Sequence, residues 1–276
     1  MVQRFARAWL LLAISLAFAG FAQGAETVSG ASPSPTINRV VARGELIVGT
    51  TGSMPPLNMT TRDGDLIGLD IDLARVIAAA MEVELVAKTM PFADLLPALE
   101  AGKVDIVISG MTITPSRNRK WAFVGPYFVS GKSIVAKRAA VASVKKPTDL
   151  NVPEMTLAAL NGSTSAAFVE KLLPRAKLVT VKDYDEGVSL VLEDRVSALV
   201  ADQPICQVSV LRHKDRGLVT LKDTLSYEPL GVALPPNDPL LVNWVQNVLS
   251  GFTASGELDQ LRKRWFEETD WLAKLP

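Results

Sequence analysis

The chain has 276 residues, of which 48% are hydrophobic and 21% are charged, and its 29 basic residues balance its 29 acidic ones. This composition is typical of a globular protein with one large domain or two smaller ones. A neutral chain without an arginine-rich run lacks the electrostatic footprint of a nucleic-acid-binding protein, so we expect no nucleic acid among its partners.

The first 24 residues have the pattern of a secretory signal peptide. Arg4 and Arg7 precede a short apolar run that ends in the small-residue segment Ala22–Gly24. The run is shorter than the roughly 20 residues that cross a bilayer, and a basic start with this ending is typical of a cleavable signal. We therefore predict export with cleavage near Gly24, followed by a flexible leader over residues 25–37, where Ser, Gly and Pro recur.

Strand-like and helix-like patterns alternate after this leader. The first cycle predicts strands at 45–49, 84–88 and 104–109, and helices at 69–80 and 93–101. The third of these strands is apolar enough to be buried on both faces of a parallel sheet. This β-α-β-α-β order is typical of an α/β lobe.

A second cycle of the same kind follows a turn-rich segment at 145–148. It predicts strands at 155–160, 177–182 and 198–201, with helices at 165–173 and 185–193. One more strand, at 231–234, precedes two amphipathic helices. Two α/β units in one chain form a cleft, and ligands of open α/β sheets bind beyond the carboxyl ends of the strands.

The residues after the third strand give the strongest indication of a ligand. Thr114 is placed to cap a short helix that begins at Pro115, and Arg117 lies in its first turn, where the helix dipole disfavours a cation. The strand ends at Gly110, so the backbone N–H groups that follow are free to face a ligand. Together with an arginine, such groups can bind a carboxylate. A surface ion pair of Arg117 is the alternative.

Polar residues also follow two strands of the second unit. The segment Asn161–Ser165 offers hydroxyl and N–H groups at a helix start, for which helix capping is an alternative explanation. Asp202 follows an apolar strand and could bind an ammonium group or cap the next helix; the residues alone leave both open. Phe92 precedes a helix and could form the floor of the cleft or part of the core.

Motifs of other chemistries are missing from the sequence. It contains no H-E-x-x-H, C-x-x-C or G-x-S-x-G, and its single cysteine, Cys206, has no partner for a disulfide. We therefore predict no catalytic residues, no metal and no cofactor.

Several short segments form a more specific pattern. In chain order they are Gly68–Ala74, Phe92 with Leu95–Leu99, Val104–Ile106, Gly110–Thr114 with Arg117, Gly125–Tyr127, Gly162–Thr164 and Val200–Asp202. With this order and spacing, the chain from about Asn38 onward resembles the periplasmic solute-binding proteins of polar amino-acid ABC transporters (family 3). The resemblance implies the α/β, two-lobed type II periplasmic-binding fold, in which each lobe is a mostly parallel sheet flanked by helices.

The resemblance also implies an organisation and a set of partners. The first lobe would comprise residues 38–130 and 229–276, and the second lobe residues 131–228, with two crossing segments as the hinge. The protein would be a periplasmic monomer whose partners are an amino acid and the membrane permease of an ABC transporter.

Site roles follow from the same resemblance. Arg117 would hold the α-carboxylate of the amino acid and Asp202 its α-ammonium group, and Phe92 would flank the ligand side chain. The other residues expected in the site are Thr112, Gly110, Thr164, Ser163, Thr51, Met54 and Leu160.

One side of the expected pocket departs from the pattern of family members that bind basic amino acids. Those proteins usually have an acid at the position of Thr51, an aromatic residue at that of Met54 and a phenylalanine at that of Leu57. A cationic ligand side chain would lack a partner here, which is costly in a buried site. We therefore predict a neutral amino acid.

Two alternatives remain at this level, because the same fold carries other functions. Val48–Gly52 also resembles the start of cyclohexadienyl dehydratases, but an elimination needs a general acid, and Asp202 is the only acid expected in the cleft. The other alternative is the ligand-binding module of a sensor.

Overall fold

The computed structural model describes residues 34–137, 144 and 146–276; the predicted signal peptide and most of the predicted leader lie outside this part. Residues 35–37 begin helix α1 (Pro35–Arg43) rather than continuing a leader. The Ser34 hydroxyl accepts the N–H of Ile37, and the N–H of Thr36 donates to the buried carboxylate of Asp238 at 2.8 Å. These two bonds fix the start of the helix.

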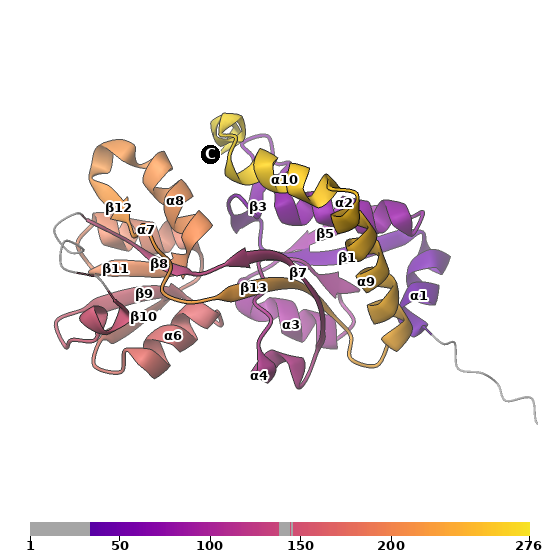
Figure 1. Cartoon of the computed structure of the whole chain (residues 1–276), viewed down its shortest axis with the longest axis horizontal. Coiled ribbons are helices and arrows are strands. Elements are labelled where there is room, and N and C mark those ends of the chain that lie inside the picture. The colour runs from indigo at the N-terminus through magenta and orange to yellow at the C-terminus, as the bar shows by residue number, and fades with distance from the viewer. Residues whose placement is uncertain (1–33, 138–143, 145) are drawn as a thin grey trace, which may run out of the picture. The chain divides into compact units, whose positions relative to one another are not determined.

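Five strands form the sheet of the first lobe (Figure 1). In hydrogen-bonded order they are β5 (Glu84–Thr89), β1 (Glu45–Thr50), β6 (Ile106–Val107), β13 (Glu228–Leu234) and β7 (Ala122–Ser130). The first three run parallel, as the β-α-β pattern predicts, and β13 is antiparallel to both of its neighbours. The sheet is thus mixed.

Helices cover the faces of this sheet. They are α1, α2 (Leu69–Ala80), α3 (Phe92–Glu100), α9 (Pro239–Ala254) and α10 (Glu257–Phe266), and a 3-10 turn at Asp270–Lys274 follows. A small antiparallel sheet of β2 (Ser53–Met54), β3 (Asn58–Thr60) and β4 (Leu66–Ile67) adjoins them. The two amphipathic helices of the predicted C-terminal region, α9 and α10, therefore pack on the first lobe.

The second lobe has a sheet of the same design. Its strands, in hydrogen-bonded order, are β10 (Lys177–Val181), β9 (Thr156–Leu160), β11 (Ala198–Asp202), β8 (Lys132–Lys137) and β12 (Leu218–Thr220). The first three are parallel and β8 is antiparallel to both neighbours. Helices α6 (Thr164–Leu172), α7 (Tyr184–Leu192) and α8 (Gln203–Arg212) pack on it, and short 3-10 turns occupy Pro147–Leu150 and Lys214–Arg216.

The predicted strand at 104–109 is shorter in the structure than the sequence indicates. Only Ile106 and Val107 pair as β6. Asp105 instead turns its carboxylate to the side chains of Arg39 and Arg43 and accepts the N–H of Ile47 at 2.9 Å. This half of the segment therefore ties α1 to β1.

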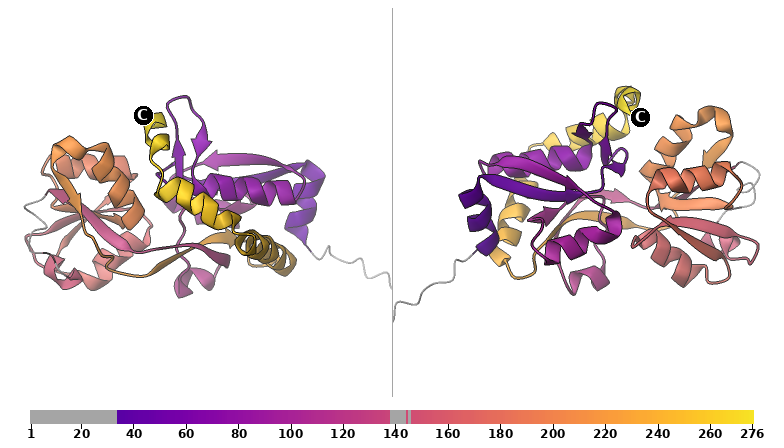
Figure 2. Two further views of the ribbon diagram at one scale, coloured as in Figure 1. Left: turned by 45° about the horizontal axis from the view of Figure 1, so that its top comes forward. Right: turned by 180° about the vertical axis from the view of Figure 1, so that it is seen from behind.

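Two paired strands carry the chain between the lobes (Figure 2). β7 ends at Ser130, which pairs with Glu228, the first residue of β13, and β8 begins at Lys132. Gly131 lies between them in close contact with the other crossing segment. A Cβ atom at Gly131 would lie 2.3 Å from the carbonyl oxygen of Ser226, so no side chain fits there. We call residues 130–132 and 226–228 the crossing.

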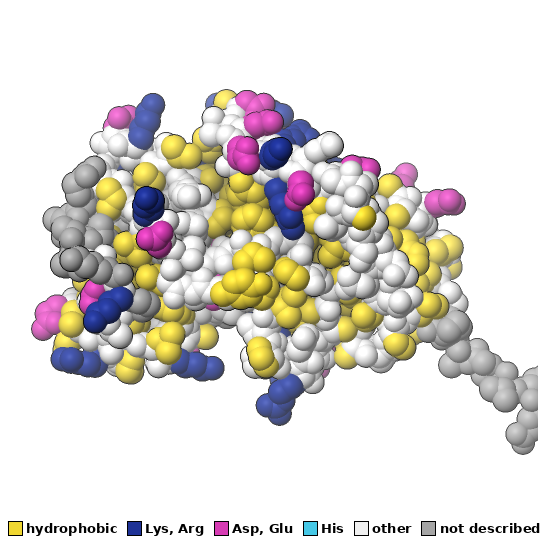
Figure 3. Space-filling model, viewed as in Figure 1, with side chains coloured by type: hydrophobic (Ala, Val, Ile, Leu, Met, Phe, Trp, Pro, Cys, Tyr) yellow, Lys and Arg dark blue, Asp and Glu magenta, His cyan; other side chains and the backbone are white. Residues whose placement is uncertain are grey.

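The exposed surface near the crossing is partly apolar. Val129 and Tyr227 are exposed, and Figure 3 shows hydrophobic side chains gathered over the region of β7 and β13. Among the described residues, no helix combines the length and the apolar character that a membrane span requires.

Candidate functional site

Arg117 projects from the short helix α4 (Pro115–Asn118) toward the second lobe. The predicted cap is confirmed, because the Thr114 hydroxyl accepts the N–H of Arg117 at 3.2 Å. The guanidinium donates from Nη1 to the carbonyl oxygen of Thr112 at 2.9 Å and from Nη2 to that of Gly162 at 3.3 Å. The second bond joins the two lobes, since Gly162 lies between β9 and α6.

The guanidinium of Arg117 is a partly buried cation without a counter-ion among the described residues. Its two acceptors are backbone carbonyl oxygens, and no carboxylate of the described residues forms an ion pair with it. Burial lowers the pKa of Arg117 to about 10, against the opposing influence of Glu228 and Asp202, so the group stays charged at neutral pH. The surface ion pair considered above is not formed. A partly buried cation in this state favours an incoming anion.

Phe92 lies beside Arg117 on the same lobe. It is the first residue of α3, its side chain is buried, and the guanidinium carbon lies 5.8 Å from the centre of its ring. This distance is within the range of a cation–π contact. The ring therefore forms part of the wall around the guanidinium.

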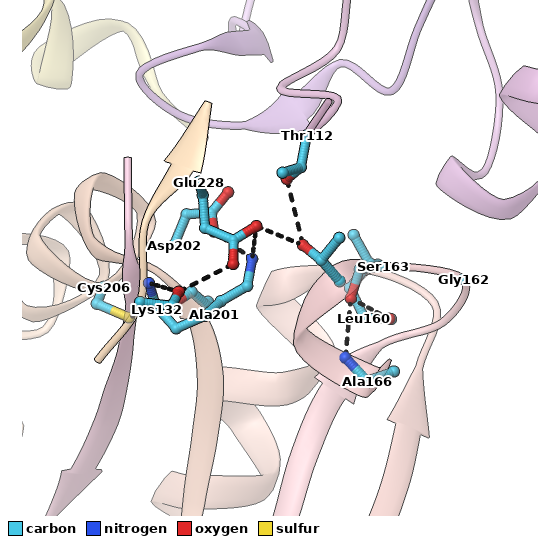
Figure 4. Close-up of polar contacts among 12 residues, drawn as sticks. Thr112, Lys132, Leu160, Gly162, Ser163, Ala166, Ala201, Asp202, Cys206 and Glu228 are labelled. Carbon is cyan, nitrogen blue, oxygen red and sulfur yellow. Dashed lines mark hydrogen bonds and ion pairs between the residues drawn. The ribbon is translucent and has the colours of Figure 1, made fainter. Parts of the chain in front are cut away.

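Two threonine hydroxyls meet where the lobes face each other. Thr112 Oγ1 and Thr164 Oγ1 are 3.2 Å apart (Figure 4), and Thr164 is the first residue of α6. The neighbouring Ser163 has the capping role considered above: its hydroxyl accepts the N–H of Ala166 at 3.2 Å and donates to the carbonyl oxygen of Leu160 at 2.6 Å. Capping therefore occupies Ser163, while Thr164 is directed to the other lobe.

Asp202 lies in a buried cluster with Lys132 and Glu228. The Lys132 ammonium is 2.5 Å from Asp202 Oδ1 and 3.5 Å from Glu228 Oε2, and all three side chains are buried. Asp202 makes no side-chain cap of α8, so the capping alternative does not hold. Burial raises the pKa of Asp202, and Lys132 opposes that rise. We call these three residues the acidic cluster, since they carry two negative charges and one positive charge.

Glu228 links the acidic cluster to the threonine pair. Its Oε2 atom accepts the hydroxyl of Thr164 at 3.0 Å, and its Oε1 atom accepts that of Ser226 at 2.9 Å. These bonds form one chain that runs from Thr112 through Thr164 and Glu228 to Lys132, and Figure 4 labels Thr112, Glu228 and Lys132 along it. The acid at the crossing therefore borders the same interlobe space as Arg117.

Lys132 and Glu228 are absent from the site that the sequence predicts. Glu228 is thus a second acid in the region where only Asp202 was expected. The feature that could have identified Lys132 is strand register, because Lys132 of β8 lies opposite Asp202 of the antiparallel strand β11. A single sequence gives no measure of pairing between residues 70 positions apart, and this is why both residues were missed.

The remaining predicted residues are buried or hydrogen-bonded within their own lobes. Met54 and Leu57 are buried, and both approach the space where a Cβ atom of Gly110 would lie. Thr51 donates its hydroxyl to Asn58 Oδ1 at 2.7 Å. Leu160 is buried at the end of β9.

The N–H of Gly110 has a partner within the protein. We expected this group to face a ligand, but it donates to the hydroxyl of Tyr127 at 3.2 Å. The Tyr127 hydroxyl in turn donates to Asp70 Oδ1 at 2.7 Å, and Asn58 Nδ2 donates to Asp70 Oδ2 at 2.7 Å. Burial raises the pKa of Asp70 to about 6 although these hydrogen bonds lower it. Asp70 thus supports the loop beneath the site.

Metal ligands do not gather in the described part of the chain, where no group of three or more His, Cys, Asp or Glu residues is placed to hold an ion. The chemistry of the site is that of a cation on one side, carboxylates on the other and hydroxyls between them. Such a site can bind a dipolar solute without reacting with it.

Comparison with known proteins agrees with this description. The model of the bacterial extracellular solute-binding proteins, family 3, matches residues 46–268, and the chain belongs to this family. ABC transporter arginine-binding protein 1 of Escherichia coli (strain K12) is 26% identical over 226 residues, which cover 80% of this chain and 90% of that protein.

Solved structures identify the fold. A candidate binding component of an ABC transporter from Wolinella succinogenes DSM 1740, complexed with lysine, has a TM-score of 0.80 at 38% identity, covering 84% of this chain and 100% of that one. An ancestral amino acid-binding protein, described as a precursor of cyclohexadienyl dehydratase, has a TM-score of 0.77 at 35% identity, covering 84% and 99%. The fold is therefore the two-lobed type II periplasmic-binding fold.

Proposed function

We propose that this protein is the extracytoplasmic solute-binding component of an ABC importer and that its solute is an amino acid. The observation that carries this proposal is the position of Arg117, a partly buried cation without a counter-ion, opposite a buried cluster with surplus negative charge. An α-amino acid carries a carboxylate and an ammonium group on its α-carbon, and these two charges are opposite to those of the two sides of the site. The binding of amino acids by relatives of the same family supports the assignment.

In this proposal Arg117, with Thr112 and Thr164, binds the α-carboxylate, and the acidic cluster that contains Asp202 binds the α-ammonium group. Phe92 flanks the ligand side chain. Because groups from both lobes contact the ligand together only when the lobes are closed, the ligand shifts an open–closed equilibrium toward the closed form. The closed form is what the membrane permease recognises.

The ligand side chain is neutral in this proposal. Thr51, Met54, Leu57 and Leu160 offer no charge, and the hydroxyl of Thr51 is already bonded to Asn58. A charged ligand side chain would lose its hydration there without gaining a partner.

The protein is exported as a monomer to the periplasm after cleavage near Gly24. This part of the proposal rests on the basic start, the apolar run and the small-residue segment of the first 24 residues. Mass spectrometry of the protein purified from the periplasm tests it, and an intact N-terminus would contradict it.

The binding function is tested by calorimetric titration with the twenty standard L-amino acids and L-cystine. The protein is first unfolded, dialysed and refolded to remove any co-purified solute. At least one amino acid should bind with a dissociation constant in the micromolar range or below. Absence of binding to all of them would refute the proposal.

Glu228 supports one second candidate, an elimination like that of cyclohexadienyl dehydratases. A buried carboxyl group beside Lys132, in addition to that of Asp202, is a second candidate for acid–base chemistry that the sequence did not indicate. Incubation with prephenate and with arogenate distinguishes the two, since formation of the aromatic product would favour the enzyme and no turnover would favour the binding protein.

A further inference from the structure

We infer that Glu228, rather than Asp202, is the residue that contacts the ligand ammonium group, because Lys132 already neutralises Asp202 within the second lobe. This inference rests on the proposed function and assigns its specificity to one carboxylate. It also places a specificity-determining residue at the crossing instead of at the end of a strand.

The pairing of Lys132 with Asp202 is fixed by the sheet. The two residues are register partners on the antiparallel strands β8 and β11, with an N–O distance of 2.5 Å. Both side chains are almost fully buried, at 2% and 5% relative exposure. An ammonium group bound to Asp202 Oδ1 would therefore compete with the Lys132 ammonium for the same oxygen, and like charges repel strongly in a buried site.

Glu228 carries the surplus charge of the acidic cluster. Its distance of 3.5 Å from the Lys132 ammonium is 1.0 Å longer than that of Asp202, so the lysine is committed mainly to Asp202. The three residues together have a net charge of −1, and Arg117 has a charge of +1. A neutral zwitterion therefore balances the site when its ammonium group lies at Glu228 and its carboxylate at Arg117.

The position of Glu228 fits contact with a ligand. Its Oε2 atom accepts the hydroxyl of Thr164 at 3.0 Å, and that hydroxyl lies 3.2 Å from Thr112 of the other lobe. The carboxylate is thus one hydrogen bond from the surface where the lobes meet (Figure 4). A ligand ammonium group can take the place of the Thr164 hydroxyl as its donor, and a charged donor binds a carboxylate more strongly than a neutral one.

The test measures how each variant distinguishes an amino acid from the same molecule without its amino group. The probes are the amino acid that binds the wild-type protein most tightly in the panel above and the carboxylic acid in which hydrogen replaces that amino group. Calorimetry gives the dissociation constant of the carboxylic acid divided by that of the amino acid, and this ratio measures how much the ammonium group contributes to binding. Only contacts with the ammonium group change this ratio, whereas a loss of structure lowers the affinity for both probes.

Glu228→Gln should reduce the ratio roughly 30-fold or more, as expected when one partner of a buried charge pair is removed. The double variant Lys132→Met/Asp202→Asn removes the internal ion pair and leaves Glu228 charged, so its ratio should stay within about threefold of the wild-type value, whatever its affinity. The exposed Glu170 of α6 provides a matched control, and Glu170→Gln should leave both affinities unchanged.

The reverse pattern would overturn the inference and assign the ammonium group to Asp202. In that pattern Glu228→Gln keeps the wild-type ratio, whether or not the double variant keeps it. If the double variant binds neither probe, the ratio of Glu228→Gln decides alone. If the wild-type protein binds no amino acid, the proposed function fails first, and the two failures are thus distinguishable.

Discussion

The hydroxyl oxygens of Thr112 and Thr164 lie 3.2 Å apart although the residues belong to different lobes. A hydrogen bond of this kind contributes about 1 kcal/mol, which is too little to hold two lobes together. Arg117 also donates to the carbonyl oxygen of Gly162, and Arg212 of α8 donates to that of Pro276 at 3.4 Å. A ligand that bound groups of both lobes would add to these contacts, and the predictions below test the groups that would do so.

Arg117→Ala should lower the affinity for the bound amino acid at least about 100-fold, because the carboxylate loses the guanidinium that binds it. The fold should survive, since the guanidinium makes hydrogen bonds to carbonyl groups but no ion pair. Calorimetry and thermal melting measure the two effects. Arg119→Ala, an exposed arginine two residues along, is the control. Equal affinity of wild type and Arg117→Ala would remove Arg117 from the site.

Gly162→Ala should weaken ligand binding by disfavouring closure. Gly162 has φ of 72°, and an added Cβ atom would lie 3.1 Å from the Cβ atom of Ala93 on the other lobe. Gly44→Ala is the matched control, because Gly44 has φ of 75° but open space around it. Both variants should lose about 1–2 kcal/mol of stability from the left-handed backbone. Only Gly162→Ala should also lose affinity, and an equal effect of both variants on affinity would contradict this.

Lys132→Met should destabilise the protein by about 3–5 kcal/mol, because two buried carboxylates lose their common cation. The double variant Lys132→Met/Asp202→Asn should recover most of that loss, since Glu228 keeps the hydroxyl donors Thr164 and Ser226. Urea unfolding of the three proteins measures the difference. If the double variant is no more stable than Lys132→Met, Lys132 does not stabilise the protein through its ion pair with Asp202.

Asp70 should make the protein less stable as the pH rises from about 4 to about 7. Its pKa is about 6 in the folded protein and 3.8 in the absence of structure, so the folded state holds the proton more tightly. The stabilisation from this proton is complete below the lower pKa and is lost as the pH passes the higher one, with a total of about 3 kcal/mol.

Asp70→Asn isolates this contribution. The difference in free energy of unfolding between wild type and variant, measured in urea at both pH values, should change in favour of the variant as the pH rises. A difference that is independent of pH would show that Asp70 does not titrate in this range.

The local elements of the fold were predictable because their signals are local. Helix α2 spans the predicted residues 69–80, and the parallel strands β1, β5 and β9 lie within one residue of the predicted ranges. The antiparallel strands β7 and β8 were not predicted. β7 contains a glycine and a proline, neither strand has a clean alternation, and their stability comes from pairing with β13 and β11, which lie far along the chain.

The site was predictable only in part, and for the same reason. Arg117, Thr112 and Thr164 follow strands or begin helices, and a local pattern identifies such residues. The partners of Asp202 depend on strand register and on the crossing, which no local pattern reports. The sequence leaves helix capping open as an explanation for both Ser163 and Asp202. In the structure the side chain of Ser163 caps its helix and that of Asp202 does not.

The place of β13 in the first sheet has a consequence for how the chain folds. β13 lies between β6 and β7, yet almost a hundred residues separate it from β7 along the sequence. Until residues 228–234 have left the ribosome, β6 and β7 present unpaired edges, which are prone to aggregation. The second lobe, by contrast, is made in one continuous stretch. We therefore expect the second lobe to fold first during synthesis. The sheet of the first lobe can be completed only after residues 228–234 have been made, when about a sixth of the chain remains to be synthesised.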